Sequence, residues 1–236
     1  MMIALAIVFA IALALTVAII CHSSMQGKDL PPDDSFPYPL PPDHSSAPDV
    51  PVGLITTEEE PVTTADPGNG LCFQPTGRGA CTLVGLGSCR EAFVVIPEYS
   101  PAGDLVTAVA NQALMGCETV TAIQIPASVS QIGYLAFSGC PNLIYISVSE
   151  NNPAYCDRDG VLYSADGKTL ILYPPLRAGS SLNIPASVTR ISDMAFYQCV
   201  YLTSIRYAGS AEQWENILIG TKNYSLIAAS VIFSVS

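Results

Sequence analysis

Histidine and positively charged residues are scarce in this 236-residue chain. Its two histidines, His22 and His44, both precede residue 71. A catalytic cysteine or serine needs a neighbouring general base, so the lack of histidine after residue 70 argues against triad chemistry there. The nine Lys and Arg are outnumbered by 20 Asp and Glu, whereas nucleic-acid binding requires clustered positive charge. We therefore expect neither a triad enzyme nor a nucleic-acid partner.

Motifs for metals and nucleotides are also missing. No Cys-x-x-Cys pair occurs, so a zinc site is not expected. The segment Asp157-Arg-Asp-Gly160 lacks the remaining ligand positions and the terminal Glu of a calcium loop, which favours a simple turn. Gly85-Leu-Gly87 has no third glycine and no following helix, so it is not a nucleotide-binding motif. We expect a non-catalytic protein without a cofactor or a metal.

Charged side chains are absent from residues 1–21. Residues 3–20 are apolar except Thr16, and as a helix they would span roughly 27 Å, close to the hydrocarbon thickness of a bilayer. The segment lacks the basic start of a signal peptide, and Ala18-Ile-Ile20 is a poor cleavage site. We predict an uncleaved transmembrane helix. A cleaved signal, which would make the protein secreted, and a lipoprotein anchored at Cys21 are the alternatives. No flanking positive charge fixes the orientation of the helix.

Residues 22–70 combine proline with negative charge. They hold 10 of the 19 prolines, nine of the 20 carboxylates and one Lys, so eight units of the net charge of −11 lie here. Proline fixes φ and removes backbone donors, and like charges repel one another. We predict a disordered, extended acidic linker between the membrane segment and a nearly neutral domain of residues 71–236.

The sequence after residue 104 repeats itself. Ile125-Pro-Ala-Ser-Val-Ser-Gln-Ile132 recurs as Ile184-Pro-Ala-Ser-Val-Thr-Arg-Ile191, and each copy is followed by Ala-Phe and a cysteine, Cys140 or Cys199. A degenerate copy ends at Cys117, 23 residues before Cys140, and the spacing to Cys199 is one more period plus a 36-residue insertion. Each cysteine precedes apolar residues in a Leu-x-x-Leu-x-Leu pattern, the strand signature of a leucine-rich repeat. Units this small must stack to share a core.

The pattern Ile-Pro-x-Ser-Val-Ser/Thr-x-Ile, followed by Ala-Phe-x-x-Cys-x-x-Leu, resembles the BspA-like leucine-rich repeats (leucine-rich repeat 5 type) of bacterial and protist surface proteins. Residues 151–174 resemble the island between repeats in that family, and residues 207–220 resemble its C-terminal closing unit. The resemblance covers the chain from roughly Leu83 onward. It departs between Arg78 and Asp104, where the first unit is irregular. It implies cell-surface adhesion or protein binding.

We therefore predict a mainly β fold with short helices, a leucine-rich-repeat solenoid with an inserted β-hairpin and a C-terminal capping helix and strand, preceded by the N-terminal transmembrane helix. The expected segments are an N-terminal cap (71–104), repeats (105–148), a hairpin island (149–181), a further repeat (182–207) and a C-terminal cap (208–236).

Local signals define the island and the C-terminal cap. Asp166-Gly167 lies between two apolar runs and predicts a type I′ hairpin turn. Ser210 and Gln213 have the spacing of a capping box, so a helix should begin there, with Trp214 and Ile217 packed over the last repeat. Residues 230–235 should add a final strand.

The cysteines are interpreted as structural. Cys117, Cys140 and Cys199 occupy the same repeat position, which favours buried small apolar side chains. Cys72 and Cys81 could lie on one face of an N-terminal hairpin and form a disulfide outside the cell, or remain free.

Surface positions on the predicted strands remain as binding candidates. Alternation along the strands places one set of side chains outward, and its candidate ligand-binding members are Gln124, Tyr145, Ser147, Ser204 and Arg206. Tyr and Arg are typical anchors of protein interfaces, and plain solvated sheet surface is the alternative interpretation. We predict a membrane-anchored, extracellular module that binds a protein or a cell-surface macromolecule. The alternative is a structural or sensory envelope protein whose repeat domain packs on a membrane partner.

Overall fold

The computed structural model describes residues 70–234. The predicted transmembrane segment, residues 3–20, and residues 22–69 of the predicted linker lie outside the described residues. Between residues 70 and 234, no helix is both long and apolar enough to cross a membrane. The described part of the chain is mainly β, as predicted, with two five-residue helices near its C-terminal end.

The strands are short and are joined by tight turns. The elements in chain order are β1 (Cys72–Gly77), β2 (Ala80–Gly85), β3 (Phe93–Val95), β4 (Leu105–Val109), β5 (Ala122–Ile125), β6 (Gln131–Ile132), β7 (Tyr145–Val148), β8 (Tyr155–Arg158), β9 (Val161–Ser164), β10 (Thr169–Leu172), β11 (Ser181–Ile184), β12 (Arg190–Ile191), β13 (Ser204–Tyr207), α2 (Ala211–Glu215), β14 (Leu218–Ile219), α3 (Tyr224–Ala228) and β15 (Ser230–Phe233).

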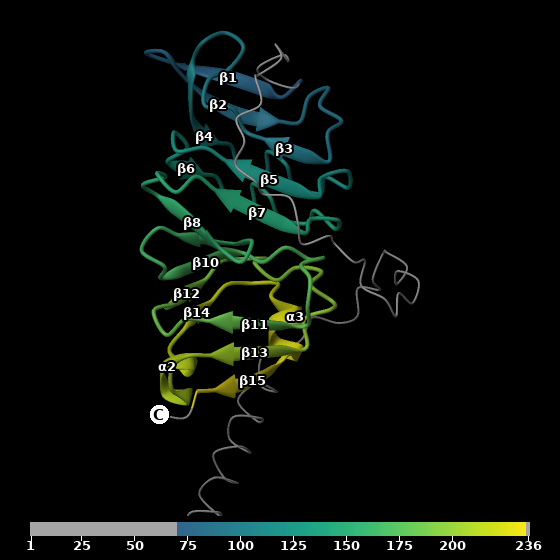
Figure 1. Cartoon of the computed structure of the whole chain (residues 1–236), viewed down its shortest axis with the longest axis vertical. Coiled ribbons are helices and arrows are strands. Elements are labelled where there is room, and N and C mark those ends of the chain that lie inside the picture. Colours follow the sequence, from purple (N-terminus) through teal and green to yellow (C-terminus); the bar gives the residue numbers. More distant parts are fainter. Residues whose placement is uncertain (1–69, 235–236) are drawn as a thin grey trace, which may run out of the picture. The chain divides into compact units, whose positions relative to one another are not determined.

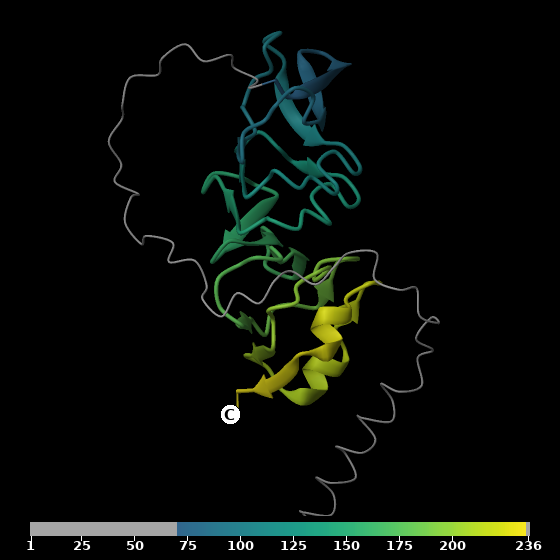
Figure 2. The same cartoon turned by 90° about the vertical axis from the view of Figure 1, so that its right-hand side faces the viewer.

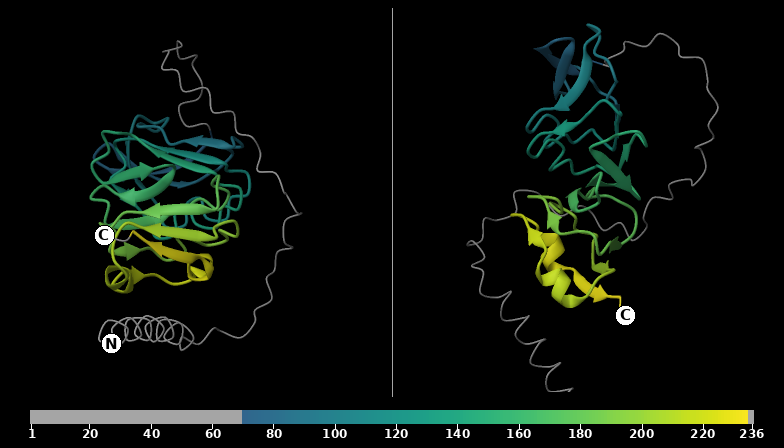
Figure 3. Two further views of the ribbon diagram at one scale, coloured as in Figure 1. Left: turned by 60° about the horizontal axis from the view of Figure 1, so that its bottom comes forward. Right: turned by 90° about the vertical axis from the view of Figure 1, so that its left-hand side faces the viewer.

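The strands stack into two walls along the length of the domain (Figures 1 and 2). One wall consists of the sheets β1-β2-β4-β6 and β8-β9-β10-β12-β14, and the other consists of the sheets β3-β5-β7 and β11-β13-β15. Successive coils of the chain pair in parallel, as β5 does with β7 and β13 does with β15. Figure 3 shows these stacked strands from two further directions. The predicted solenoid is therefore confirmed.

The repeat motif determines where each strand ends and which side chains it buries. In β5, Ile123 and Ile125 are fully buried while Gln124 is exposed, so alternate residues face the core. Proline follows Ile125, and it also follows Ile184 at the end of β11. Because proline has no N–H to donate, it ends the ladder at these positions.

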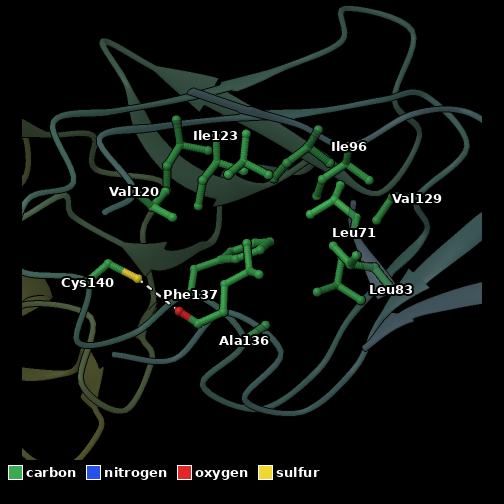
Figure 4. Close-up of a cluster of buried hydrophobic side chains, with 14 of the residues drawn as sticks. Leu71, Leu83, Ile96, Val120, Ile123, Val129, Ala136, Phe137 and Cys140 are labelled. Carbon is green, nitrogen blue, oxygen red and sulfur yellow. Dashed lines mark hydrogen bonds between the residues drawn. The ribbon is translucent and has the colours of Figure 1, made fainter. Parts of the chain in front are cut away.

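Two hydrophobic clusters fill the space between the walls. In the first, Val120 and Ile123 from one side face Ala136 and Phe137 from the other (Figure 4). Each of these side chains is almost completely buried, and burying a large apolar side chain stabilises a fold by about 1.5–3 kcal/mol. A single repeat contributes only one layer of this core, so the layers must stack to exclude water.

The two clusters meet at β9, in the island. Val161 and Tyr163 belong to the C-terminal cluster, whereas Leu162 between them belongs to the N-terminal cluster. All three side chains are buried. Because neighbouring residues of a strand point to opposite faces, this one strand contributes to both cores.

The island differs from the predicted hairpin in two respects. It is a three-stranded antiparallel meander, β8-β9-β10, that continues in parallel with β12. Its type I′ turn is formed by Asp159-Gly160, with φ of 51° and 80°. At Asp166-Gly167 only Gly167 has a positive φ, 65°, because the Asp166 carboxylate accepts the Lys168 N–H over 3.0 Å and holds an Asx turn. The prediction of a type I′ turn at Asp166-Gly167 is therefore wrong.

The C-terminal cap begins as predicted. The Ser210 hydroxyl accepts the Gln213 N–H over 3.2 Å, and the Gln213 side-chain oxygen accepts the Ser210 N–H over 2.9 Å, which completes the capping box of α2. Trp214 is buried, and its ring meets the Tyr207 ring edge-on with centroids 5.2 Å apart. The helix therefore covers the core of the last repeat.

The chain then makes one further coil. Ile217 is buried as predicted, and β14 and α3, which the sequence did not predict, follow it. The final strand, β15, begins at Ser230 as predicted and ends at Phe233. The coil extends both walls, because β14 pairs with β12 and β15 pairs with β13.

Candidate functional site

The outer face of the β3-β5-β7 sheet carries two rows of side chains. The rows are Phe93, Ala122 and Tyr145, and next to them Val95, Gln124 and Ser147. None of these side chains is charged, and Phe93 and Tyr145 are 50% and 43% exposed. The sheet therefore presents an uncharged surface with an exposed aromatic ring on each of its two outer strands.

The island fixes the position of the Tyr145 ring. The ring lies directly on Gly160 of the type I′ turn, where a Cβ atom would overlap the ring. Partial burial raises the pKa of the Tyr145 hydroxyl, and the nearby carboxylates of Asp157 and Asp159 raise this pKa further. The Arg177 guanidinium holds this turn, because its Nε donates to the Asp159 carbonyl over 2.8 Å and one terminal nitrogen lies 4.0 Å from the Asp159 carboxylate.

Ser204 and Arg206 lie on a different sheet, β11-β13-β15. The outer rows of this sheet are Ser181, Ser204 and Ser230, and Asn183, Arg206 and Ile232. Apart from Ile232, every member is polar or charged. Three of the predicted residues, Gln124, Tyr145 and Ser147, therefore lie on the outer face of β3-β5-β7, the aromatic face, where Gln124 and Ser147 are direct neighbours. The other two, Ser204 and Arg206, lie on the outer face of β11-β13-β15, the polar face.

Six outward side chains on these faces were missed by the sequence prediction. They are Phe93, Val95, Ser181, Asn183, Ser230 and Ile232, and Phe93 is the most exposed hydrophobic side chain of the aromatic face. A signal was present, because proline follows Ile96 in the same way that it follows Ile125 at the end of β5. Aligning these two Ile-Pro steps places Phe93 and Val95 on the outer face despite the irregular first unit.

The acidic residues near this face serve structural roles. The Asp157 carboxylate accepts the Val148 N–H over 2.8 Å, and Asp159 is held by Arg177. The segment from Asp157 to Gly160 forms the end of β8 and the Asp159-Gly160 turn, so the predicted turn is confined to its last two residues. Among residues 70–234, no three His, Cys, Asp or Glu side chains gather closely enough to hold a metal ion.

The β1-β2 hairpin separates the two cysteines that were considered for a disulfide. Cys81 lies opposite Pro75 and is fully buried, whereas Cys72 lies opposite Gly85 and is exposed. The register of the hairpin shifts after Cys72, so the two thiols do not share a face. Both are free, so the structure has the second of the two alternatives, free cysteines, and no Cys72–Cys81 disulfide.

The repeat region matches a known family model. The model for the BspA type leucine rich repeat region matches residues 100–157 and 178–223, in six copies. A leucine rich cell surface protein from Faecalibacterium prausnitzii is 30% identical, with a TM-score of 0.47 over 66% of this chain and 44% of that chain. The pneumococcal vaccine antigen PcpA is 24% identical, with a TM-score of 0.46 over 55% of this chain and 31% of that chain. The leucine rich repeat protein of T. pallidum is 22% identical, with a TM-score of 0.39 over 59% of this chain and 70% of that chain.

The matched residues coincide with the two stretches that carry the Ile-Pro-Ala-Ser-Val motif, and the gap between them falls in the island. No curated protein sequence matches the chain. The chain spans less than half of the Faecalibacterium protein and of PcpA. The motif, the stacked parallel coils and the family match agree, and residues 100–157 and 178–223 are therefore BspA-type leucine-rich repeats.

Proposed function

We propose that this chain is a non-catalytic binding module that recognises a protein on a cell surface through the outer face of β3-β5-β7. One observation carries the proposal: Phe93 and Tyr145 are exposed aromatic side chains in one row of an uncharged sheet, with the small Ala122 between them. Aromatic side chains are enriched at protein interfaces, where a few of them supply most of the binding energy.

The rigidity of this face also supports the proposal. Both rings project from strands whose inward side chains are buried, and the Tyr145 ring rests on the Gly160 turn. A ring that is already held in place loses little conformational freedom when a partner binds, so more of the contact energy remains for affinity. The polar face around Arg206 would then serve as a hydrogen-bonding region beside the aromatic contact.

The proposed location follows from the segments outside the described residues. An anchor at residues 3–20 and an acidic linker at residues 22–70 would hold the domain outside the membrane. Treating intact cells with a protease should release the domain by cutting the linker. Full protection of the domain would contradict an extracellular location.

A capture experiment tests the binding face. The full chain in detergent micelles would be used to capture proteins from a surface-biotinylated cell extract. Replacing both aromatic residues, Phe93→Ala and Tyr145→Ala, should reduce the specific capture at least tenfold, since each anchor contributes about 1 kcal/mol or more. The matched control is Tyr201→Ala with Tyr224→Ala, two exposed tyrosines that lie on neither outer face.

Further variants separate the two faces. If Arg206→Ala alone abolishes capture while the aromatic double variant retains it, the polar face binds the ligand and the aromatic proposal fails. The second candidate function, a structural envelope protein packed on a membrane partner, predicts that the chain co-purifies with an integral membrane protein of its own cell and captures nothing from a foreign cell surface.

A further inference from the structure

Each coil of the solenoid turns after its strand in the wall that contains β4, β6 and β12. We call a corner the segment that leads from that strand to a buried core residue of the same coil. Three corners have the same length, with the core residue five positions after the wall residue, and each contains one residue with a left-handed φ near 55°. The wall and core residues of these three corners are Val109 and Leu114, Ile132 and Phe137, and Ile191 and Phe196. The left-handed residues between them are Gln112, Leu135 and Met194, respectively.

The corner of the island is two residues shorter. Leu170 pairs with Ile191, so it occupies the wall position of its coil. Tyr173 occupies the core position, because its ring stacks on Phe196 with centroids 5.4 Å apart and its carbonyl accepts the Cys199 thiol. Only Ile171 and Leu172 lie between Leu170 and Tyr173, where the other corners have four residues.

A groove of about 270 Å³ lies at this shortened corner. It is lined by residues 132–138 of the regular corner, by Tyr155, Ile171 and Leu172, and by Arg190, Ser192 and Asp193. The groove therefore marks the place where a corner of normal length would have put two more residues.

The backbone amides along the regular corners show what the groove lacks. The Gln112 N–H donates to the Tyr134 carbonyl over 2.9 Å, and the Leu114 N–H donates to the Ala136 carbonyl over 2.7 Å. The repeat places the amides of Leu135 and Phe137 in the equivalent positions. Among residues 70–234, neither of those amides has a hydrogen-bond acceptor.

The last regular corner confirms that this pairing is the rule. The Met194 N–H donates to the Thr221 carbonyl over 2.8 Å, and the Phe196 N–H donates to the Asn223 side-chain oxygen over 2.9 Å. Among the regular corners of residues 70–234, the two amides are thus paired at Val109–Leu114 and at Ile191–Phe196 and unpaired at Ile132–Phe137, beside the groove. An unpaired backbone amide away from bulk water is unfavourable, so binding of an acceptor to the amides of Leu135 and Phe137 should be favourable.

We propose that this groove binds a short extended segment of a partner polypeptide, whose carbonyl oxygens accept the N–H groups of Leu135 and Phe137. The amides are two residues apart, and in the regular corners they meet carbonyls that are also two residues apart. An extended peptide reproduces that spacing, because alternate residues of an extended chain point the same way. The two oxygens of a single carboxylate lie too close together to reach both amides.

The mouth of the groove agrees with a neutral peptide ligand. The half-exposed Tyr134, the carboxylate of Asp193 and the guanidinium of Arg190 line the groove. The mouth therefore carries one positive and one negative group, which offers no attraction for a strongly charged ligand. The volume admits about two residues, at the small end of ligand pockets.

Hydrogen exchange tests the free amides. In the full chain in detergent micelles, the amides of Leu135 and Phe137 should exchange at least tenfold faster than those of Gln112 and Leu114, since hydrogen-bonded amides exchange only when the structure opens. Equal protection of the two corners would overturn the proposal, because it would mean that the amides above the groove already have acceptors.

Peptide binding is tested with a probe based on the chain itself. Acetyl-Asn-Met-Ala-amide corresponds to residues 193–195 with the carboxylate of Asp193 replaced by an amide, so it is neutral and presents two carbonyls with the required spacing. Titrated into the ¹⁵N-labelled full chain, it should give saturable shifts of the Leu135 and Phe137 amide signals, with a Kd of roughly 1 mM. Absence of shifts at tenfold higher concentration would contradict the proposal. If sodium acetate causes the same shifts, the groove binds a simple anion rather than a peptide, and the proposal is wrong.

A variant that fills the groove provides the decisive comparison. Inserting Asp-Met after Ile171 restores a corner of normal length, and it should slow exchange of the Leu135 and Phe137 amides at least tenfold and abolish the peptide-induced shifts. If the insertion prevents folding, Ser192→Phe blocks the same space, and Ser149→Phe, at another partly buried serine outside the groove, is its control. If the blocked variant still binds the peptide, the ligand does not occupy this groove and the proposal is wrong.

Discussion

The thiol of Cys140 donates a hydrogen bond to the carbonyl of Leu114, 26 residues earlier, over 3.0 Å. Cys199 repeats this contact with the carbonyl of Tyr173 over 3.6 Å. Both cysteines are fully buried, and the thiol is a small, weak donor that can meet a carbonyl of the preceding coil without bringing a strongly polar group into the core. This contact gives a physical reason for cysteine at that position of the repeat.

Stability should fall at alkaline pH through Cys140. Burial raises the pKa of its thiol to about 11, from an ordinary value of 9.0. Below pH 9 the thiol is neutral in both states, so its contribution to stability is complete. Between pH 9 and 11 the unfolded chain ionises ahead of the folded one, and the free energy of unfolding should fall by about 2 kcal/mol across that window. Urea denaturation of the wild type and of Cys140→Ala at pH 7, 9, 10 and 11 measures this difference. Parallel pH profiles would contradict it.

Asn223 should be essential for the last coil. Its side chain is buried, accepts the Phe196 N–H, and donates to the Ser192 and Gly220 carbonyls over 3.0 and 2.9 Å. Asn223→Ala leaves these groups unpaired, so we expect a loss of about 2–4 kcal/mol in the free energy of unfolding. The control is Asn142→Ala, an exposed asparagine with one hydrogen bond to a carbonyl, which should cost less than about 1 kcal/mol.

The asparagine has a second expected property. Asn223-Tyr-Ser225 has the form of a glycosylation sequon, but both amide hydrogens of Asn223 are engaged inside the fold. A folded chain should therefore carry no glycan at this position, which mass spectrometry of the protein secreted from a eukaryotic host can check.

Two glutamine-to-glycine substitutions should change the stability of the domain in opposite directions. Gln112 is exposed and has a φ of 57°, a conformation that costs a side-chain-bearing residue about 1 kcal/mol, so Gln112→Gly should stabilise the domain by up to about 1 kcal/mol. Gln131 is also exposed but lies in β6 with ordinary backbone angles, and Gln131→Gly should destabilise it by about 0.5–1 kcal/mol. Thermal unfolding of both variants gives the two signs, and a loss of stability in both would contradict the argument.

The contact between Gly160 and Tyr145 should be measurable by a similar pair. Gly160 and Gly179 both have a φ above 75°, so alanine strains the backbone at either position. A Cβ atom at Gly179 meets nothing, whereas at Gly160 it would overlap the Tyr145 ring. Gly160→Ala should therefore cost at least about 1 kcal/mol more than Gly179→Ala, and it alone should displace the ring. Chemical denaturation and the NMR signals of the Tyr145 ring report these two effects.

The features that follow from local sequence could be predicted. The strand ends at Ile125 and Ile184 depend on the proline that follows, and the start of α2 depends on Ser210 and Gln213. The repeat period of 23 residues then predicts the stacking, because equivalent residues of successive coils must be neighbours.

The island and the candidate face required the three-dimensional structure. The chain contains Asp159-Gly160 and Asp166-Gly167, and the dipeptide alone does not tell which of them has two positive φ angles. That difference depends on the hydrogen bond from the Lys168 N–H to the Asp166 carboxylate. The division of the predicted row between two sheets likewise depends on how the inserted meander interrupts the ladder, which no local pattern encodes.

The sharing of β9 between the two cores has a consequence for synthesis of the chain. Coils made early by the ribosome can stack as they emerge, since each pairs with the coil before it. Their core, however, remains open at one end until Leu162 arrives, and the later core has no first layer until Val161 and Tyr163 are placed. Synthesis of the island therefore closes the core of the first half of the domain and supplies the first layer on which the second half packs.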